Sequence, residues 1–506
     1  MHRHPDFWIA VVALACIFFG VWHLVGTTQG LDVRAVEVGQ TPVTVFQTPS
    51  GGPRPVVVIA HGFAGSQQLM QPFAVTLARN GYLAATFDFL GHGANPLPLG
   101  GSITEETGAT QYLLEELGRV VRFAIDDPAS DGRLALLGHS MASDIVVRFA
   151  QAQPEVQATV AVSMFAPGVT ATTPENLLIV VGAWEPALKR EALRVLALAA
   201  PESGPTPGLT LGQTHDGTGR RVAFAPGAEH IGVLYSPVAL DEARRWLDQV
   251  FERDSAAGVD DRRLALGALF LGLVLLARPL TGWLPVASPR PVGAGLRWRL
   301  LLPVALAPAI LTPLLLWRLP TDFLPILVGD YLALHFGLYG ALTALGLWLT
   351  RSRGGLPTPT VWWAFATAAA LLTLYSILAF ALPIDRYVTA FVPTFARMPL
   401  VLVMLAGMLP YFLADEWLTR GSGSPRFAYP LTKLCFLVSL AMAVALDLER
   451  LFFLIVIVPV IVGCFVVYGL FSSWAYRRTN HPLVAGIASA TAFAWAIAVT
   501  FPFLGG

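Results

Sequence analysis

The sequence predicts an α/β domain with a mostly parallel sheet, joined to an N-terminal anchor helix and a C-terminal all-α bundle of transmembrane helices. Only 13% of the 506 residues are charged and the mean hydropathy is +0.61, whereas a soluble domain carries ~25% charged residues. Between residues 27 and 261 the chain is rich in acidic side chains, and short apolar runs alternate with amphipathic stretches. An α/β segment therefore lies between apolar ones.

The composition also excludes several classes of protein. The chain has 33 basic and 33 acidic residues, so it lacks the basic excess of a nucleic-acid-binding protein. Its cysteines show neither a disulfide framework nor zinc-ligand spacing, because all three lie in apolar runs. The sequence has no glycine-rich phosphate loop, HExxH motif or dinucleotide fingerprint. We therefore expect no cofactor, no metal and no nucleic-acid partner.

An N-terminal transmembrane anchor is predicted over residues 1–30. The stretch Phe7–Gly26 is apolar apart from His23 and has the length of a membrane span, about 20 residues. It is longer than the apolar region of a cleaved signal peptide, about 7–15 residues.

A C-terminal transmembrane domain of about eight helices is predicted over residues 257–506. Arg278 interrupts the first of its spans, and Asp415 with Glu416 are interpreted as charges at a loop end. The eight expected spans are residues 264–284, 299–317, 324–349, 361–382, 398–414, 430–447, 451–471 and 482–503.

Basic residues predict the orientation, because cytoplasmic loops carry an excess of them. With the N-terminus in the cytoplasm, the opposite loops of the membrane region hold only Arg318, Arg386, Arg397 and Arg450. We expect an integral membrane protein of about nine spans, with the α/β domain on the extracytoplasmic side. The cytoplasmic ends and loops then hold Arg278, Arg290, Arg297, Arg299, Arg351, Arg353, Arg420, Arg426, Lys433, Arg477 and Arg478.

Residues 31–256 are predicted to form the α/β domain. Pro55–Ala60 is a continuous apolar run, as expected for a strand buried on both faces of a parallel sheet. The other predicted strands are Val43–Phe46, Leu83–Phe87, Leu134–Leu137, Thr159–Ser163, Leu177–Val181 and Arg221–Ala225. The predicted helices are Gln67–Asn80, Thr104–Ile125, Ala142–Gln151, Ala187–Ala200 and Pro237–Phe251.

The pentapeptide GHSMA, residues 138–142, has the context of a nucleophile elbow. It follows the strand Leu134–Leu137 and precedes a helix, and small residues stand two places before and two places after Ser140. Serine is a weak nucleophile unless a base lies beside it. An ordinary glycine-rich turn with a capping serine is the alternative for this motif alone.

Two further strand ends supply an acid and a base. Leu177–Val181 runs into Glu185, and Arg221–Ala225 runs into His230. Carboxyl ends of parallel strands share one edge of a sheet, so both side chains are expected near Ser140. His230 would accept the serine proton, and Glu185 would orient the imidazole.

Oxyanion donors are expected at two backbone positions. The motif HGFAGS, residues 61–66, follows the strand Pro55–Ala60. A loop in this place donates one N–H to the oxyanion and the residue after the nucleophile donates another, which indicates Phe63 and Met141. His61 itself is interpreted as a residue that packs the loop.

Residues 33–252 resemble the α/β-hydrolase superfamily of serine esterases and lipases. The resemblance covers less than half of the chain, and the whole nine-span chain is assigned to no family. The motifs that carry the resemblance are HGFAGS (61–66), FDFLGHGAN (87–95), GHSMA (138–142), VVGAWEP (180–186) and PGAEHIGVL (226–234).

The resemblance implies Ser140 as nucleophile, Phe63 and Met141 as oxyanion amides, Glu185 as acid and His230 as base. It also implies structural roles for two residues of the second motif, Asp88 and His92. Family members more often have aspartate at the position of Glu185, and the rival acids in this sequence are Glu229 and Asp216.

Asp330 and His335 lie inside an expected span. An ionisable residue inside the membrane is a candidate for function. A polar tie between helices, or a position near the water interface, is the favoured interpretation here.

The expected function is that of a membrane-anchored serine hydrolase. It would cleave carboxylic esters or thioesters of lipidic substrates through a Ser140–His230–Glu185 triad and an acyl-enzyme, with the acyl-ester substrate and membrane lipids as partners. An acyltransferase with the same triad is one alternative. A transporter or receptor that carries a hydrolase-like binding domain is another.

Overall fold

The computed structural model describes residues 3–101, 108–199, 206–350 and 360–505. Its contacts define two compact units. Unit 1 comprises Met1–Phe18, Ala268–Pro383 and Val392–Phe501, and unit 2 comprises Phe19–Gly267, Ile384–Phe391 and Pro502–Gly506. From the sequence we predict consecutive domains with boundaries at residues 30 and 256. That prediction does not include the two short later segments that belong to unit 2.

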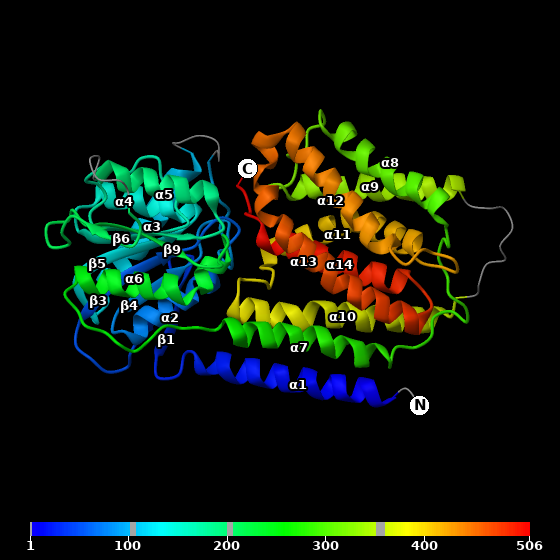
Figure 1. Cartoon of the computed structure of the whole chain (residues 1–506), viewed down its shortest axis with the longest axis horizontal. Helices are drawn as coiled ribbons and strands as arrows, with labels where there is room; N and C mark the ends of the chain where they lie inside the picture. The colour runs from blue at the N-terminus through cyan, green and yellow to red at the C-terminus, as the bar shows by residue number, and fades with distance from the viewer. Residues whose placement is uncertain (1–2, 102–107, 200–205, 351–359, 506) are drawn as a thin grey trace. The chain divides into compact units, whose positions relative to one another are not determined.

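Unit 2 is built on one nine-stranded sheet (Figure 1). The strand order is β1-β2-β4-β3-β5-β6-β7-β9-β8, and the five neighbouring pairs from β4 to β9 are parallel. The mostly parallel sheet confirms the predicted fold class. The strands are β1 (Asp32–Val38), β2 (Thr41–Gln47), β3 (Arg54–Ala60), β4 (Leu83–Phe87), β5 (Ser130–His139), β6 (Val156–Val162), β7 (Leu177–Gly182), β8 (Thr210–Leu211) and β9 (Arg220–Ala225).

Helices cover both faces of this sheet. Helices α3, α4 and α5 pack on one face and α2 and α6 on the other (Figure 1). The helices are α2 (Gln71–Arg79), preceded by the 3-10 turn η1 (Gln67–Met70), α3 (Ala109–Ile125), α4 (Met141–Ala152), α5 (Pro186–Ala199) and α6 (Pro237–Val250), with a second 3-10 turn, η2 (Gly232–Tyr235), before α6. The first four residues of the predicted helix Thr104–Ile125 and the last residue of the predicted helix Ala187–Ala200 lie outside the described residues.

Alternating side chains explain the two-sided core. In β3, Val57 and Ile59 pack in the α2/α6 layer, whereas Val56 and Val58 pack in the α3/α4 layer, and all four are fully buried. A strand buried on both faces reads as a continuous apolar run. β1 alternates between half-buried and exposed positions, which is why its sequence gave no comparable signal.

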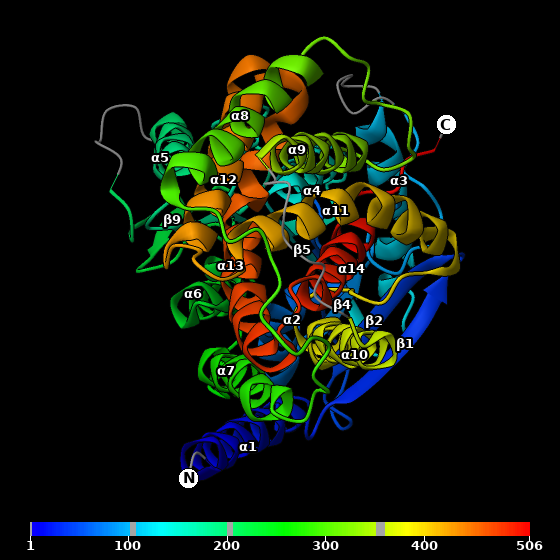
Figure 2. The same ribbon diagram turned by 90° about the vertical axis from the view of Figure 1, so that its right-hand side faces the viewer.

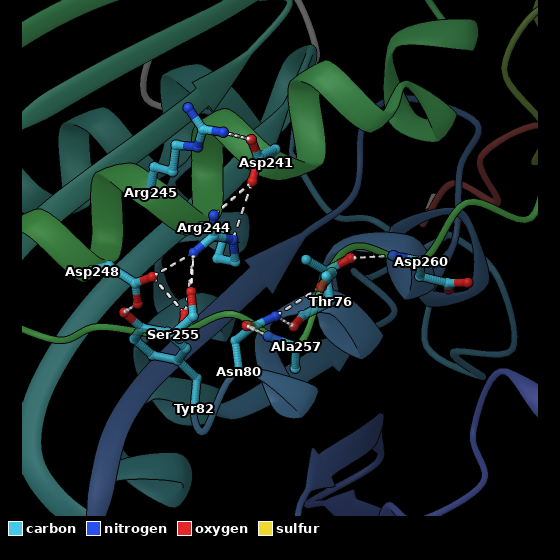
Figure 3. A network of polar contacts seen from close by, with 11 residues as sticks. Thr76, Asn80, Tyr82, Asp241, Arg244, Arg245, Asp248, Ser255, Ala257 and Asp260 are labelled. Carbon is cyan, nitrogen blue, oxygen red and sulfur yellow. Dashed lines mark hydrogen bonds and ion pairs between the residues drawn. The ribbon is translucent and has the colours of Figure 1, made fainter.

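The stretch that follows α6 is tied to unit 2 by a polar network (Figure 3). The Asn80 side chain accepts from the Ala257 N–H at 2.9 Å and donates to the Gly258 carbonyl at 2.9 Å. Thr76 Oγ1 accepts from the Asp260 N–H at 3.0 Å. Helix α2 therefore holds the chain in place just before the next membrane-length helix begins.

Two short segments from late in the sequence complete unit 2. In the C-terminal segment, the Leu99 N–H donates to the Phe503 carbonyl at 2.8 Å and the Phe503 N–H donates to the Gly91 carbonyl at 2.8 Å. The segment Ile384–Phe391 packs Val388 against the α2/α6 core layer.

Within the described residues, nine helices are long and apolar enough to cross a membrane, as expected. They belong to α1 (Arg3–Gly26), α7 (Arg263–Thr281), α8 (Trp298–Leu316), α9 (Gly329–Thr350), α10 (Trp362–Tyr387), η3 with α11 (Phe395–Arg397 and Met398–Thr419), α12 (Ala428–Leu446), α13 (Leu448–Thr479) and α14 (Leu483–Thr500).

Small residues allow close helix packing in unit 1, as is usual between membrane helices. A Cβ at Gly272 of α7 would lie 2.7 Å from the Ala13 carbonyl oxygen of α1. The Tyr375 hydroxyl of α10 donates to the Leu273 carbonyl at 2.6 Å. Helices α1, α7 and α10 accordingly lie side by side in both views (Figures 1 and 2).

Buried polar groups in unit 1 connect its helices. His335 Nε2 lies 3.0 Å from Ser439 Oγ, which joins α9 to α12. Asp330 accepts from the backbone N–H groups of Phe323 and Tyr331 at the start of α9, at 2.9 and 2.8 Å. Both contacts agree with the structural interpretation of Asp330 and His335.

The interpretation of Asp415 and Glu416 as charges at a loop end is wrong. Helix α11 continues to Thr419, and both carboxylates are buried. Asp415 pairs with Lys433 of α12, and Glu416 accepts from Ser472 Oγ of α13 at 2.6 Å. Buried charges require such partners, so these groups tie helices together.

We predict that Trp246→Ala destabilises unit 2, with an unfolding free energy lower by ~3–5 kcal/mol. Trp246 is 1% exposed and its Nε1–H donates to the Asn176 carbonyl at 3.1 Å. The matched control is Trp184→Ala, because Trp184 is 69% exposed. Thermal unfolding of the full chain in detergent should show a lower Tm for the first variant only; equal shifts would contradict the packing argument.

Candidate active site

Ser140 occupies the turn between β5 and α4, in a strained backbone conformation. Its φ is 53° and its ψ is −117°, a region that non-glycine residues rarely adopt. A Cβ at Gly138 would lie 2.4 Å from the Ala142 carbonyl oxygen, so the turn is too crowded for a larger residue. The two small positions of the GHSMA motif thus allow the turn that presents the serine.

The HGFAGS loop passes directly beside this turn. A Cβ at Gly62 would lie 2.9 Å from the Ser140 Cβ, so only glycine permits this approach. Met141 is the first residue of α4, and the first N–H groups of a helix have no partner within it. Met141 therefore lies next to Ser140 in the chain, and Phe63 follows Gly62, which contacts Ser140 in the fold.

The structure brings the three predicted side chains together. His230 Nε2 lies 2.9 Å from Ser140 Oγ, and His230 Nδ1 lies 2.6 Å from Glu185 Oε1. With Nδ1–H donating to the carboxylate, the Nε2 lone pair faces the serine hydroxyl. This arrangement of a hydroxyl, an imidazole and a carboxylate is able to take a proton from Ser140 as its oxygen attacks a carbonyl carbon.

The second carboxylate oxygen of Glu185 has its own partners. Ser163 Oγ donates to Glu185 Oε2 at 2.6 Å, and the Gly182 N–H donates to it at 2.7 Å. Glu185 is 8% exposed, and these bonds satisfy a buried charge. Ser163 is a residue that the sequence interpretation missed, although it ends the predicted strand Thr159–Ser163.

The rival carboxylates bond elsewhere. Glu229 accepts from the backbone N–H groups of Ile231 and Gly232, at 2.9 and 2.6 Å. Asp216 accepts from the Thr218 hydroxyl at 2.6 Å. Among the described residues, Glu185 is therefore the one of these three acids whose carboxylate bonds to the imidazole of His230.

His139 is a second residue that the sequence interpretation missed. Its Nε2 lies 3.0 Å from the His230 carbonyl oxygen, and its side chain is buried. Burial, with a smaller contribution from His230, lowers the pKa of His139 to about 3. A neutral His139 therefore donates to the loop that carries His230, and its place directly before Ser140 was the only available signal.

His61 and Asp88 have structural partners. His61 Nε2 accepts from the Phe89 N–H at 3.1 Å, and its Nδ1 lies 2.8 Å from the Gly62 carbonyl oxygen, so both ring nitrogens are engaged. Asp88 accepts from the N–H groups of Gln67 and Ala94 at 2.7 and 2.9 Å. Burial raises the pKa of Asp88 to about 6. His92 bonds within the same loop, with Nδ1 2.9 Å from the Leu90 carbonyl oxygen.

Among the described residues, no group of three or more histidine, cysteine, aspartate or glutamate side chains is arranged to hold a metal ion.

The fold and site place this domain in the α/β-hydrolase class, and the comparisons agree. Residues 51–218 match the family model described as serine aminopeptidase, S33, which is an α/β-hydrolase family. The match confirms the α/β-hydrolase domain and supports hydrolase activity. A search of curated proteins found no significant match.

Solved structures that match part of this chain include a hypothetical protein from Pseudomonas aeruginosa, with 12% identity over 44% of this chain and 94% of that one and a TM-score of 0.33. A protein described as a dienelactone hydrolase from Klebsiella pneumoniae has 16% identity over 44% and 99%, with a TM-score of 0.32. An epoxide hydrolase from Vigna radiata has 27% identity over 28% and 40%, with a TM-score of 0.22.

We predict that His139→Gln weakens the dependence of stability on pH. Unfolded histidine gains a proton below about pH 6.5, whereas folded His139 stays neutral down to about 3. The contribution of His139 to the free energy of unfolding is therefore complete above pH 6.5 and is smaller by about 2 kcal/mol at pH 5. The Tm deficit of the variant relative to the wild type should therefore be smaller at pH 5 than at pH 7.5.

The contributions of His61 and Asp88 are present in both proteins and cancel in this comparison. A Tm deficit that stays constant between the two pH values would contradict the assignment of His139 as a buried neutral donor.

Proposed function

We propose that this protein is a membrane-anchored serine hydrolase that cleaves carboxylic esters or thioesters of lipidic substrates through an acyl-enzyme. The observation that carries the proposal is the position of His230, 2.9 Å from Ser140 Oγ and 2.6 Å from Glu185 Oε1. Those distances are within hydrogen-bond reach for general-base catalysis. The strained turn at Ser140 supports the same role, because such strain gathers at active sites.

In the proposed reaction, Ser140 Oγ attacks the carbonyl carbon while His230 Nε2 takes its proton. The N–H groups of Phe63 and Met141 donate hydrogen bonds to the carbonyl oxygen and stabilise the negative charge that develops on it. The alcohol or thiol then leaves with the proton from His230, and the acyl group stays on Ser140. Water, deprotonated by His230, releases the acid and restores the serine.

A lipidic substrate is proposed from the setting of the site. Both ends of the α/β domain continue into helices of membrane-spanning length, α1 and α7. Two large aromatic side chains lie close to triad partners in the chain. Trp184, directly before Glu185, is 69% exposed, and Phe165, two residues after the Ser163 that bonds Glu185, is 61% exposed. Exposed apolar groups beside a site favour an apolar substrate.

The α/β domain is proposed to lie outside the cytoplasm. The basic residues of the membrane loops favour that side, although Arg351 and Arg353 lie outside the described residues. The number of crossings supports the span count, whichever side the domain lies on. Four candidate spans separate residue 261 from Val388, and eight separate it from Pro502, so even counts return both segments to the side of unit 2, to which they belong.

We predict that Glu185→Gln lowers kcat for short p-nitrophenyl esters by roughly 10²- to 10⁴-fold, because an amide cannot hold the imidazole in the reactive tautomer. The matched control is Glu229→Gln, which changes the adjacent rival acid and should leave kcat near the wild-type value. Steady-state kinetics of the full chain in detergent measures both. Similar losses in the two variants would contradict the role of Glu185.

Ser140→Ala tests the function itself. The variant should lose ester hydrolysis and covalent labelling by a fluorophosphonate. Ester hydrolysis that survives this change would refute the proposed function. Cleavage of aminoacyl p-nitroanilides in preference to esters by the wild type would replace the proposed substrate class with a peptide-like one, and acyl transfer to an added alcohol without free acid would indicate a transferase.

We predict that a cysteine placed at Ser50 reacts with a membrane-impermeant maleimide in intact cells, whereas one placed at Ser422 reacts only after permeabilisation. Ser50 is exposed on unit 2, and Ser422 follows α11, which places the two positions on opposite sides in the proposed topology. The reverse pattern would invert the orientation, and labelling of both in intact cells would refute the span count.

A further inference from the structure

The segment Ile384–Phe391 at the end of α10 reaches the loop that carries the candidate oxyanion amide. The Ala390 N–H donates to Ser66 Oγ at 2.8 Å, and Thr389 Oγ1 lies 3.0 Å from the same oxygen. Ser66 Oγ in turn donates to Gln68 Oε1 at 2.7 Å. Because the one O–H of Ser66 donates to Gln68, the Thr389 hydroxyl must be the donor in its contact with Ser66. The Ser66 oxygen then makes all three of its possible hydrogen bonds, one as donor and two as acceptor.

Ser66 lies at the end of the HGFAGS loop, opposite the point where that loop contacts Ser140. Gly62 lies against Ser140, an approach that is possible because glycine has no Cβ. The Gly65 N–H donates to the Gly62 carbonyl at 3.1 Å. The next residue, Gln67, is fixed by its bond to Asp88. Phe63 thus lies in a tight turn that is held at Gly62 on one side and at Ser66 on the other.

The segment that holds Ser66 is itself well ordered by its own bonds. The N–H groups of Val388 and Thr389 donate to the Ile384 carbonyl at 2.8 and 2.9 Å. The Phe391 N–H donates to Asp385 Oδ1 at 2.7 Å. Val388 packs on the core of unit 2, and Ala390 is 6% exposed. A segment fixed in this way is able to constrain the loop it contacts.

We propose that Thr389 and Ser66 are positioning residues for the oxyanion hole, so that a segment far along the chain sets the geometry of the Phe63 N–H. This inference rests on the proposed function, since it assigns a role to that same site. A displacement of about 1 Å at a catalytic group costs as much as ~100-fold in rate. Loss of the Thr389 and Ser66 hydroxyls should therefore reduce kcat while substrate binding is retained.

The test uses the full chain in detergent and three substitutions. Ser66→Ala and Thr389→Val remove the hydroxyls, and Thr389→Ser keeps one in place. We expect the first two to lower kcat for p-nitrophenyl esters, and the rate of fluorophosphonate labelling, by about 10- to 100-fold at unchanged KM. Thr389→Ser should restore both rates. Thr394→Val, outside unit 2, is the matched control and should behave as the wild type.

The positioning role would be overturned if Ser66→Ala and Thr389→Val kept the wild-type kcat and labelling rate and only their Tm fell. The contact would then be purely structural. If Ser66→Ala does not fold, the Thr389→Val and Thr389→Ser pair decides the matter alone. Failure of the proposed function looks different: the wild type would then not be labelled at Ser140, or Ser140→Ala would remain active.

Discussion

The carboxylate of Glu185 is the point on which the site depends, because it joins three strand ends. One oxygen accepts from His230 after β9, and the other accepts from Ser163 after β6 and from the Gly182 N–H at the end of β7. Each partner arrives from a different part of the chain, so the contact exists only once the sheet has its full register. Without any one of these partners, the buried carboxylate would lose a hydrogen bond that offsets the cost of its desolvation. The bonds that stabilise this edge of the sheet therefore also orient the imidazole.

Crowding supplies the second constraint, and it acts on the nucleophile. Ser140 is held at a positive φ because Gly138 brings the strand against the Ala142 carbonyl and Gly62 brings the neighbouring loop against the serine itself. Rigid packing of this kind stores strain that the surrounding sheet maintains. It also ties the nucleophile to the loop of Phe63, so that the reactive oxygen and the candidate oxyanion amide are positioned by one set of contacts.

Much of this was predictable from strand ends. Ser140, Glu185 and His230 each follow an apolar run, and parallel strands bring their carboxyl ends to one edge. The sequence could not reveal Ser163, His139 or Ser66 as partners, since their roles depend on register and on loop paths that no local pattern encodes. The edge strand β1 was missed because its half-buried side carries Asp32 and Arg34 as well as Val36 and Val38, so residue type does not mark that side. Asp415 and Glu416 were misassigned because their partners lie on other helices.

The membrane region is subject to a constraint that a simple tether would not impose. Segments 384–391 and 502–505 complete unit 2 through hydrogen bonds to Ser66, Gly91 and Leu99, so in the proposed topology each must return to the side of the membrane on which the α/β domain lies. In that topology the number of spans between residue 261 and each segment must be even, and the loss or gain of a single helix would move at least one segment to the other side of the membrane. An anchor whose only task was attachment could change its span count freely. In the proposed topology the count is instead coupled to the bonds that fix the Ser66 loop beside Ser140 and the chain from Gly91 to Leu99.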